Sequence, residues 1–247
     1  DSIATGRWVR DISNTFVTPE MFGVTDSTTP SINVIGLTNW INCRQQLWTD
    51  KKTYVVNREI RYMVDVDLMG LGTIKRDAEI TATTTTSITT GTNPTVIGVD
   101  DVSTFEVGMR VTVTTGNQRD DGCVVQHTIT DITGNNITVD TNFTKAFSSG
   151  ATLVSYYPVI GNLGTVDNIT WMGVNIDGNQ ANNASYQTWD ISSSLKFYAN
   201  KGSLVGANII NSMADGVLVS GSDITIEKNV IKNSGAGAVH LGESTGI

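Results

Sequence analysis

Charged residues, proline, cysteine and long apolar runs are all scarce in this chain of 247 residues. Only 16% of the residues are charged, and there are 4 prolines and 2 cysteines. Lys, Glu and Gln, which favour helices, are also sparse, so long amphipathic helices are not expected. No apolar stretch approaches the roughly 20 residues needed to span a membrane. The abundant Thr, Asn, Ser and Gly instead favour short strands joined by tight turns.

The net charge of −8 argues against nucleic acid or an anionic membrane as the main partner, because both require a basic surface. An acidic polysaccharide is not excluded, since a local cationic patch can be hidden in the average. Cys43 and Cys123 either pair or, as we favour, remain two buried free thiols. No Cys/His cluster, phosphate loop or calcium-binding nonapeptide is visible, so we expect no metal and no cofactor.

Four zones follow one another along the chain, each with its own pattern. One zone alternates polar and apolar residues with a period of two, as in Val107–Thr114, and the turn Gly134-Asn135-Asn136 predicts a hairpin. That zone reads as a small antiparallel β module. The predicted zones are a lead-in (1–30), a capping helix over Thr38–Gln46 with the first coils (31–79), the inserted β module (80–157), and further coils (158–247), which we expect to continue beyond Ile247.

The final zone carries an internal repeat of about 21 to 22 residues. Gly216–Val219 aligns with Ala238–Leu241 at an offset of 22, and Asn208 aligns with Asn229 at an offset of 21. A unit this short cannot bury its apolar side chains alone, whereas stacked units can. In such a stack Asn208 and Asn229 should form a hydrogen-bonded ladder. The pattern predicts a solenoid with three short strands per coil; an antiparallel sandwich with chance similarity is the alternative.

The beginning of the chain resembles a known group, the pectate-lyase-like β-helix proteins, in which a helix caps the coils. Its tail-like lead-in resembles phage tail fibre and tailspike subunits in particular. The family's Gly-Asp-Gly is missing before Val24, and Pro30 interrupts the expected start of the helix. The segments that carry the resemblance are Met21–Thr28, Lys51–Val56 and Leu68–Gly72 for the β-helix, and Trp8–Arg10 and Val17–Gly23 for the tail proteins.

The resemblance implies an all-β fold, a right-handed parallel β-helix with a short N-terminal capping helix and an inserted antiparallel β module. It also implies an extracellular homotrimer in the virion tail, in contact with other tail proteins. Such proteins bind a bacterial capsule or O-antigen and often cleave it, by glycoside hydrolysis or by elimination. A non-catalytic receptor-binding or structural tail protein with the same β-helix is the alternative. A secreted pectinase-like enzyme is disfavoured by the tail-type lead-in. Neither nucleic acid nor membrane insertion is implied.

Three carboxylates are candidate catalytic residues: Asp215, Asp177 and Glu243. The segment around Asp215 resembles the Asn-Thr-Asp-Gly of polygalacturonase-type glycosidases, but Gly237-Ala238 stands where their second acidic motif would lie. Glycoside hydrolysis usually requires two carboxylates, so Asp215 alone is insufficient. Asp177 precedes a lateral loop, and Glu243 should lie on a coil beside Asp215. One alternative is that Asp215 accepts backbone N–H bonds in a turn, and another is that the outward Asp215, Glu227, His240 and Glu243 are solvated surface charge.

The lateral loop Ala181–Trp189 is a candidate sugar-binding segment. Aromatic faces stack on the C–H face of a sugar, and amides bond its hydroxyls. An ordered edge loop without a ligand is the alternative. A histidine between two inward-pointing strand residues should point outward, whereas His127 in the β module is expected to be a hydrogen-bonded strand residue. The candidate substrate-binding residues are Trp189, Tyr186, Asn182 and His240.

Overall fold

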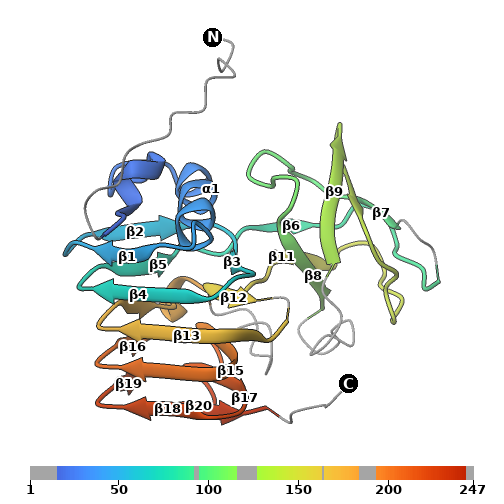
Figure 1. Cartoon of the computed structure of the whole chain (residues 1–247). Coiled ribbons are helices and arrows are strands. Elements are labelled where there is room, and N and C mark those ends of the chain that lie inside the picture. Colours follow the sequence, from blue (N-terminus) through green and yellow to red (C-terminus); the bar gives the residue numbers. More distant parts are fainter. Residues whose placement is uncertain (1–15, 92–94, 116–126, 163, 184–192, 243–247) are drawn as a thin grey trace.

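A stack of parallel coils, a helix above it and an antiparallel module beside it make up the molecule (Figure 1). The computed structural model describes residues 16–91, 95–115, 127–162, 164–183 and 193–242. These parallel coils confirm the predicted parallel β-helix, and the antiparallel module confirms the predicted insertion.

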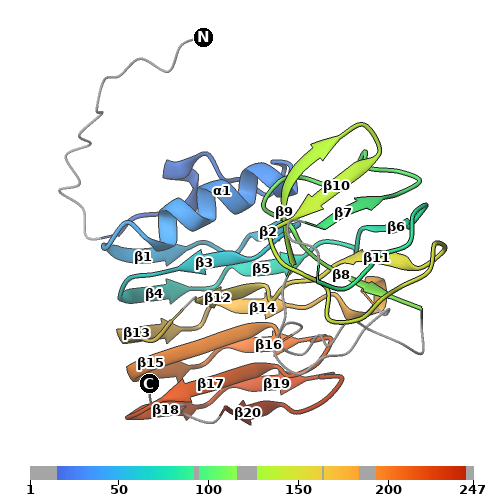
Figure 2. The same ribbon diagram turned by 90° about the vertical axis from the view of Figure 1, so that its right-hand side faces the viewer.

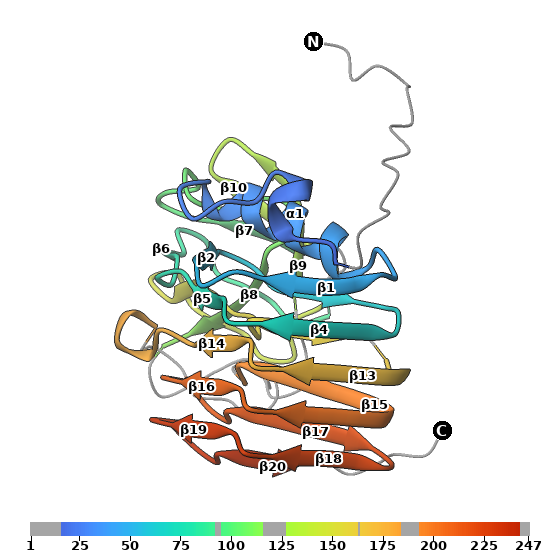
Figure 3. The same ribbon diagram turned by 60° about the vertical axis from the view of Figure 1, so that its left-hand side comes forward.

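Three faces of parallel strands build the coils (Figure 3). The first face holds β3 (Ile60–Tyr62), β12 (Ile160–Asn162), β17 (Val217–Gly221) and β20 (Val239–Leu241). The second face holds β1 (Gln46–Thr49), β4 (Val66–Gly70), β13 (Val166–Met172) and β18 (Ile224–Glu227). The third face holds β2 (Thr53–Val56), β5 (Thr73–Arg76), β14 (Asn175–Asp177), β16 (Asn208–Ile210) and β19 (Val230–Lys232). The long strand β15 (Leu195–Val205) joins the first face with its beginning and the second with its end.

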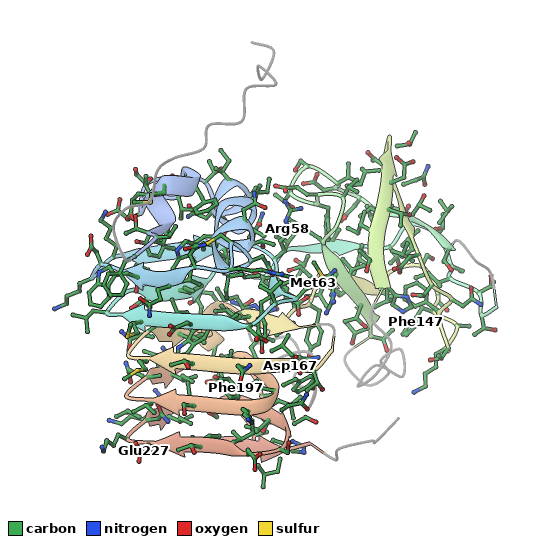
Figure 4. All side chains as sticks on the ribbon, in the orientation of Figure 1. Arg58, Met63, Phe147, Asp167, Phe197 and Glu227 are labelled. Carbon is green, nitrogen blue, oxygen red and sulfur yellow. The ribbon has the colours of Figure 1, made fainter. Side chains whose placement is uncertain are left out.

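Apolar side chains from all three faces fill the interior of the coils. Successive side chains of a strand point to opposite sides of the sheet, so every second residue faces inward. On the third face Tyr54 and four isoleucines form one inward column, and Figure 4 shows Phe197 inside the coils. Each fully buried side chain of this size contributes about 1.5–3 kcal/mol. The four isoleucines are Ile74, Ile176, Ile209 and Ile231.

The register between the last coils is 22 residues, and the predicted offset of 21 is wrong. Asn208 pairs with Val230 rather than stacking on Asn229. Asn229 bridges the coils differently: its Oδ1 accepts the Ala207 N–H at 2.8 Å and its Nδ2 donates to the Leu204 carbonyl at 2.7 Å. A slip of one residue would turn the inward apolar side chains outward, so the core dictates the 22-residue register.

A helix closes the upper end of the coils. It is α1 (Pro30–Ile41), not the predicted Thr38–Gln46, and Gln46 begins β1 instead. Proline lacks an N–H but is tolerated in the first turn, where that donor has no helical partner, so Pro30 begins the helix rather than interrupting it. The buried Trp40 fixes α1 by donating from its Nε1 to the Val17 carbonyl at 2.8 Å. Among the described residues no helix is long and apolar enough to cross a membrane.

Cys43, just after α1, is a half-buried free thiol, and burial raises its pKa. It therefore meets only part of the expectation of two buried free thiols. Cys123 lies outside the described residues.

The inserted module is a six-stranded antiparallel sheet with its own apolar core, seen beside the coils in Figure 2. The predicted hairpin is β9 and β10, which turn through Gly134. The expected strand Val107–Thr114 is shorter, because Gly108 has a φ of 88° and ends the extended backbone there. The strands are β6 (Thr81–Thr83), β7 (Thr95–Gly98), β8 (Arg110–Thr114), β9 (His127–Thr133), β10 (Asn136–Val139) and β11 (Thr152–Ser155).

His127 is a buried strand residue of this module, as predicted. Its Nδ1 lies 2.8 Å from the Thr141 Oγ1, and its ring stacks on Phe143 with centroids 3.9 Å apart. Both contacts belong to the core of the module, so His127 is not a candidate for catalysis.

Candidate functional site

A groove lies at the corner where the third face turns into the first. Between β16 and β17 the chain turns through residues 211–216, and the next coil turns through residues 233–238. On the preceding coil the connection after β14 begins with a 3₁₀ turn, η2 (Gln180–Asn182). A cavity of about 640 Å³ opens between these turns, and we call it the corner groove. It is lined by Asn179, Gln180, Ala181, Asn183, Asn211, Met213, Asn233 and Ser234.

A ladder of amides runs from coil to coil along the corner groove. Asn233 donates from its Nδ2 to the Asn211 Oδ1 at 3.1 Å, and Asn211 donates from its Nδ2 to the Asp177 Oδ1 at 3.0 Å. Both asparagines have a φ of 55°, a left-handed conformation that Asn tolerates better than most residues. The fold therefore contains an asparagine ladder, but at positions 211 and 233 instead of the predicted 208 and 229.

Two buried polar atoms in the corner groove have no hydrogen-bond partner among the described residues. They are the Oδ1 of Asn183, a fully buried side chain, and the Oγ of Ser234. The other end of the Asn183 amide is fixed, because Nδ2 donates to the Asp77 carbonyl at 2.7 Å and to the Asn179 carbonyl at 3.1 Å. An unpaired buried polar group costs about 1–3 kcal/mol, so these two atoms lower the stability of the turns that carry them.

Asp215 and His240 meet beside the corner groove. Asp215 lies in the turn 211–216, and His240 lies in β20 on the following coil. The carboxylate of Asp215 is 1% exposed; its Oδ2 lies 3.1 Å from the His240 Nδ1, while 34% of the His240 side chain is exposed. When Nδ1 donates this bond, the ring is held in one orientation and Nε2 is the nitrogen that accepts a proton. We call these two residues the Asp–His pair.

Gly237 explains why no second acid follows Asp215 on the next coil. The Gly237 N–H donates to the Asp215 Oδ1 at 2.8 Å, and a Cβ at position 237 would lie 2.9 Å from the same oxygen. The predicted alternative, an Asp that accepts a backbone N–H in a turn, is thus part of the structure. The expectation of solvated surface charge is wrong for Asp215, because its carboxylate is buried and bonds Gly237 and His240.

Asp177 belongs to the amide ladder. Its Oδ1 accepts the Asn179 N–H at 2.9 Å as well as the Asn211 amide, and its Oδ2 lies 3.9 Å from the Lys75 Nζ. A carboxylate engaged in this way shapes the corner groove by holding its two asparagines. We therefore interpret Asp177 as a residue that positions the groove.

Of the four remaining predicted site residues, only Asn182 lies among the described residues. Asn182 is exposed and donates from its Nδ2 to the Asn179 Oδ1 at 2.9 Å, next to two residues that line the corner groove. Tyr186, Trp189 and Glu243 lie outside the described residues. Sequence reasoning missed Asn211 and Asn233, although their separation of 22 residues was a signal for them.

A second groove, of about 820 Å³, lies at the corner where the first face turns into the second, at the beginning of the second-face strands. Figure 4 shows Met63 and Asp167 at this corner. Asp65 bonds the next coil there: its Oδ2 accepts from the Asn168 Nδ2 at 3.1 Å and its Oδ1 from the Asn168 N–H at 2.9 Å. These bonds lower the pKa of Asp65. A general acid needs a raised pKa, so this groove is the weaker candidate for catalysis.

No group of three or more His, Cys, Asp or Glu side chains within the described ranges is placed to hold a metal ion. The corner groove offers hydrogen bonding from amides, and His240 beside it can transfer a proton.

Comparison with known proteins gives structural matches only: no family model and no curated protein matches the chain. The tailspike gp61 of Pseudomonas phage phi297 is 11% identical with a TM-score of 0.33, and the match covers 85% of this chain and 52% of that one. The tailspike protein gp49 from Pseudomonas phage LKA1 is 9% identical with a TM-score of 0.30, and the match covers 88% of this chain and 51% of that one. The Gp54 tailspike of Acinetobacter baumannii bacteriophage AP22 was solved in complex with A. baumannii capsular saccharide. It is 11% identical with a TM-score of 0.30, and the match covers 87% of this chain and 46% of that one.

The chain thus spans about half the length of the tailspikes it matches. At these identities and TM-scores, neither an activity nor a substrate nor a partner of this chain follows from the matches. The chain is similar in structure to these tailspikes, and its own parallel coils are what confirm the predicted β-helix.

Proposed function

We propose that this chain is part of a phage tailspike, in the virion tail, that binds a bacterial surface polysaccharide in the corner groove during host attachment. The observation that carries the proposal is the lining of the groove, in which uncharged amides and a hydroxyl predominate. An amide donates and accepts hydrogen bonds, as a sugar hydroxyl does, so the two match in either direction. The ligand is a capsule or O-antigen chain.

The dimensions of the corner groove suit a short stretch of saccharide. Its 640 Å³ fall within the roughly 300–1,000 Å³ typical of small-molecule sites. Ala181 and Met213 add apolar surface to the amide lining, which matches the C–H face of a sugar ring.

The Asp–His pair supports cleavage as a second step after binding. A histidine held by a buried carboxylate is suited to act as a general base, and general bases contribute about 10²–10⁴-fold to a rate. Such a base suits elimination, in which a proton is removed from the sugar. Hydrolysis by two carboxylates requires another acid beside Asp215, for which Glu243 is the candidate. A tailspike that binds without cleaving is the alternative.

Assembly as a homotrimer, in contact with other tail proteins, is part of the same proposal. An outward column of the second face is apolar, with Trp48, Met69 and Met172 in register on successive coils, and Met172 is 42% exposed. Contiguous exposed apolar surface favours coverage by another subunit. Light scattering on the purified chain measures this directly; a mass equal to that of one chain would contradict it.

Binding is tested with a panel of purified capsular polysaccharides and lipopolysaccharides. Asn233→Ala removes one rung of the amide ladder and should weaken binding about 2–10-fold, the value of one hydrogen bond. Asn200→Ala is the matched control, since Asn200 is exposed and bonds Asp167 away from the corner groove. Equal binding by both variants, or no binding by the wild-type chain, would refute the groove as the binding site.

Cleavage is tested by size-exclusion chromatography of the bound polysaccharide. His240→Gln should leave binding within a few-fold of wild type and slow the shortening of the polymer by about 10²-fold or more. A wild-type chain that binds the polymer and never shortens it would establish the binding-only alternative.

A further inference from the structure

Three of the chain's eight arginines line one small cavity where the inserted module meets the coils. The cavity measures about 190 Å³, and Figure 4 shows Arg58 between α1 and the module. We call it the junction cavity. It is lined by Val34, Thr38, Arg58, Glu59, Arg61, Gly108 and Arg110.

The charged groups of the junction cavity connect the coils to the module. Glu59, at the start of β3, is buried, and its Oε2 accepts from the Arg61 Nε at 2.6 Å and from the Arg110 Nη2 at 3.0 Å. Arg110 belongs to β8 of the module. Arg58 donates from its Nη1 to the Val107 carbonyl at 2.9 Å and lies 3.6 Å from the Glu106 Oε2.

The lining of the junction cavity holds three arginines and one carboxylate, that of Glu59. The carboxylate of Glu106 lies beside Arg58, and Asp140 also acts on Arg110. Arg110 is 7% exposed, and its buried Nε has no hydrogen-bond partner among the described residues. Burial lowers the pKa of Arg110 even though Glu59 acts in the opposite direction. Three lining guanidinium groups beside a single lining carboxylate favour the binding of an added anion.

We propose that the junction cavity is a binding site for an oxyanion, the carboxylate or phosphate group of a small ligand, held between Arg58, Arg61 and Arg110. The planar guanidinium fork bonds two oxygens of such a group at once. The cavity exceeds the roughly 30 Å³ of a water molecule several-fold, so a small anion fits. The oxyanion comes either from an acidic sugar residue or from free inorganic phosphate.

A bound oxyanion would clamp the inserted module to the coils, because its contacts come from both. Arg58 and Arg61 belong to the coils and Arg110 to the module. A ligand that binds the folded state alone raises stability with its concentration. The site is separate from the corner groove, so it does not depend on the proposed function.

Glu59 acts as an internal competitor for the oxyanion. Its carboxylate already engages Arg61 and Arg110, so a ligand carboxylate must share these donors with it. Glu59→Gln has nearly the same shape and removes one negative charge. A charge-assisted hydrogen bond contributes enough for about a tenfold change in affinity, so this variant should bind an oxyanion about tenfold more tightly.

The test measures the Tm of the full chain during titration with sodium phosphate and, separately, with sodium glucuronate. Sodium chloride at equal ionic strength is the reference. We expect a saturable rise in Tm with at least one of the two anions. Arg58→Gln should weaken binding about tenfold, because it removes one charged donor from the rim of the cavity. Lys51→Gln, the same change of charge at an exposed lysine outside the cavity, should leave binding unchanged.

A response to phosphate alone or to glucuronate alone supports the site and identifies the source of the oxyanion. The proposal is overturned if chloride raises Tm as much as both anions, or if Lys51→Gln weakens binding as much as Arg58→Gln does. If Glu59→Gln does not fold, the comparison of Arg58→Gln with Lys51→Gln decides alone. Asn233→Ala should leave the response intact, which separates this site from the corner groove.

Discussion

Replacing the buried Asp215 by Ala and by Asn separates the two bonds that its carboxylate makes. Alanine removes both acceptors, so the Gly237 N–H and the His240 Nδ1 lose their partner. Asparagine keeps an oxygen for Gly237 but presents its NH₂ to His240. The ring must then accept with Nδ1 and carry its proton on Nε2, which is the wrong tautomer for a general base.

The cost of each change follows from the bonds lost. A hydrogen bond to a charged group contributes about 1.5–3 kcal/mol, so losing both in Asp215→Ala should cost about 3–6 kcal/mol. Asp215→Asn keeps both bonds but replaces the charged acceptor by a neutral amide, so it should cost about 1–2 kcal/mol. In a chain of this size 1 kcal/mol corresponds to about 2–4 °C in Tm, which predicts losses of about 6–24 °C for Asp215→Ala and about 2–8 °C for Asp215→Asn.

Thermal unfolding followed by circular dichroism measures these losses, and polymer shortening measures activity. We expect Asp215→Asn to stay folded and bind polysaccharide while cleaving about 10²-fold more slowly or worse. An alanine variant as stable as the asparagine variant would show that the two bonds do not hold the corner. Unchanged cleavage by Asp215→Asn would remove the Asp–His pair from the mechanism.

Two further predictions concern the contacts between coils. Gly237→Ala puts a Cβ 2.9 Å from the Asp215 Oδ1 and should cost about 1–3 kcal/mol in a denaturant melt, whereas Gly164→Ala, with open space around its Cβ, should cost far less. Asn168 holds the pKa of Asp65 below its usual value of about 3.9, so this carboxylate contributes stability above that value and loses it as the pH falls through the lowered pKa. Asp65→Asn should therefore make stability less dependent on pH on the acid side; an unchanged acid profile would contradict this.

The fold was largely predictable because the burial of apolar side chains, which stabilises it, leaves a periodic pattern in the sequence. Alternation of apolar residues predicted a strand over Val107–Thr114, of which Arg110–Thr114 forms β8, and the repeat predicted the stacking of Val217 on Val239. The helix was misplaced because Pro30 was taken as an interruption, whereas helix geometry accepts proline in its first turn. Alternation carries no information about such an end effect.

The candidate site was less predictable because it depends on the turns between strands. The outward direction of His240 follows from strand alternation, but its contact with Asp215 spans 25 residues and requires the register of two coils. That register was predicted one residue short near Asn229. The cause is Lys228, which has a φ of 56°, a left-handed conformation that cannot be predicted from a lysine in the sequence. The amide ladder was missed for the same reason.

The bonds that form the corner groove are also bonds that hold the coils in register. Asn211 and Asn233 link successive coils to Asp177, and Asp215 links its coil to Gly237. Inward positions of the strands are occupied by the core, so polar side chains that bridge coils collect at the corners, where the apolar alternation stops. A substitution there changes both the shape of the groove and the stability of the stack. Binding by corner variants must therefore be compared well below the Tm of each variant, since only then does a loss of affinity report on the groove itself.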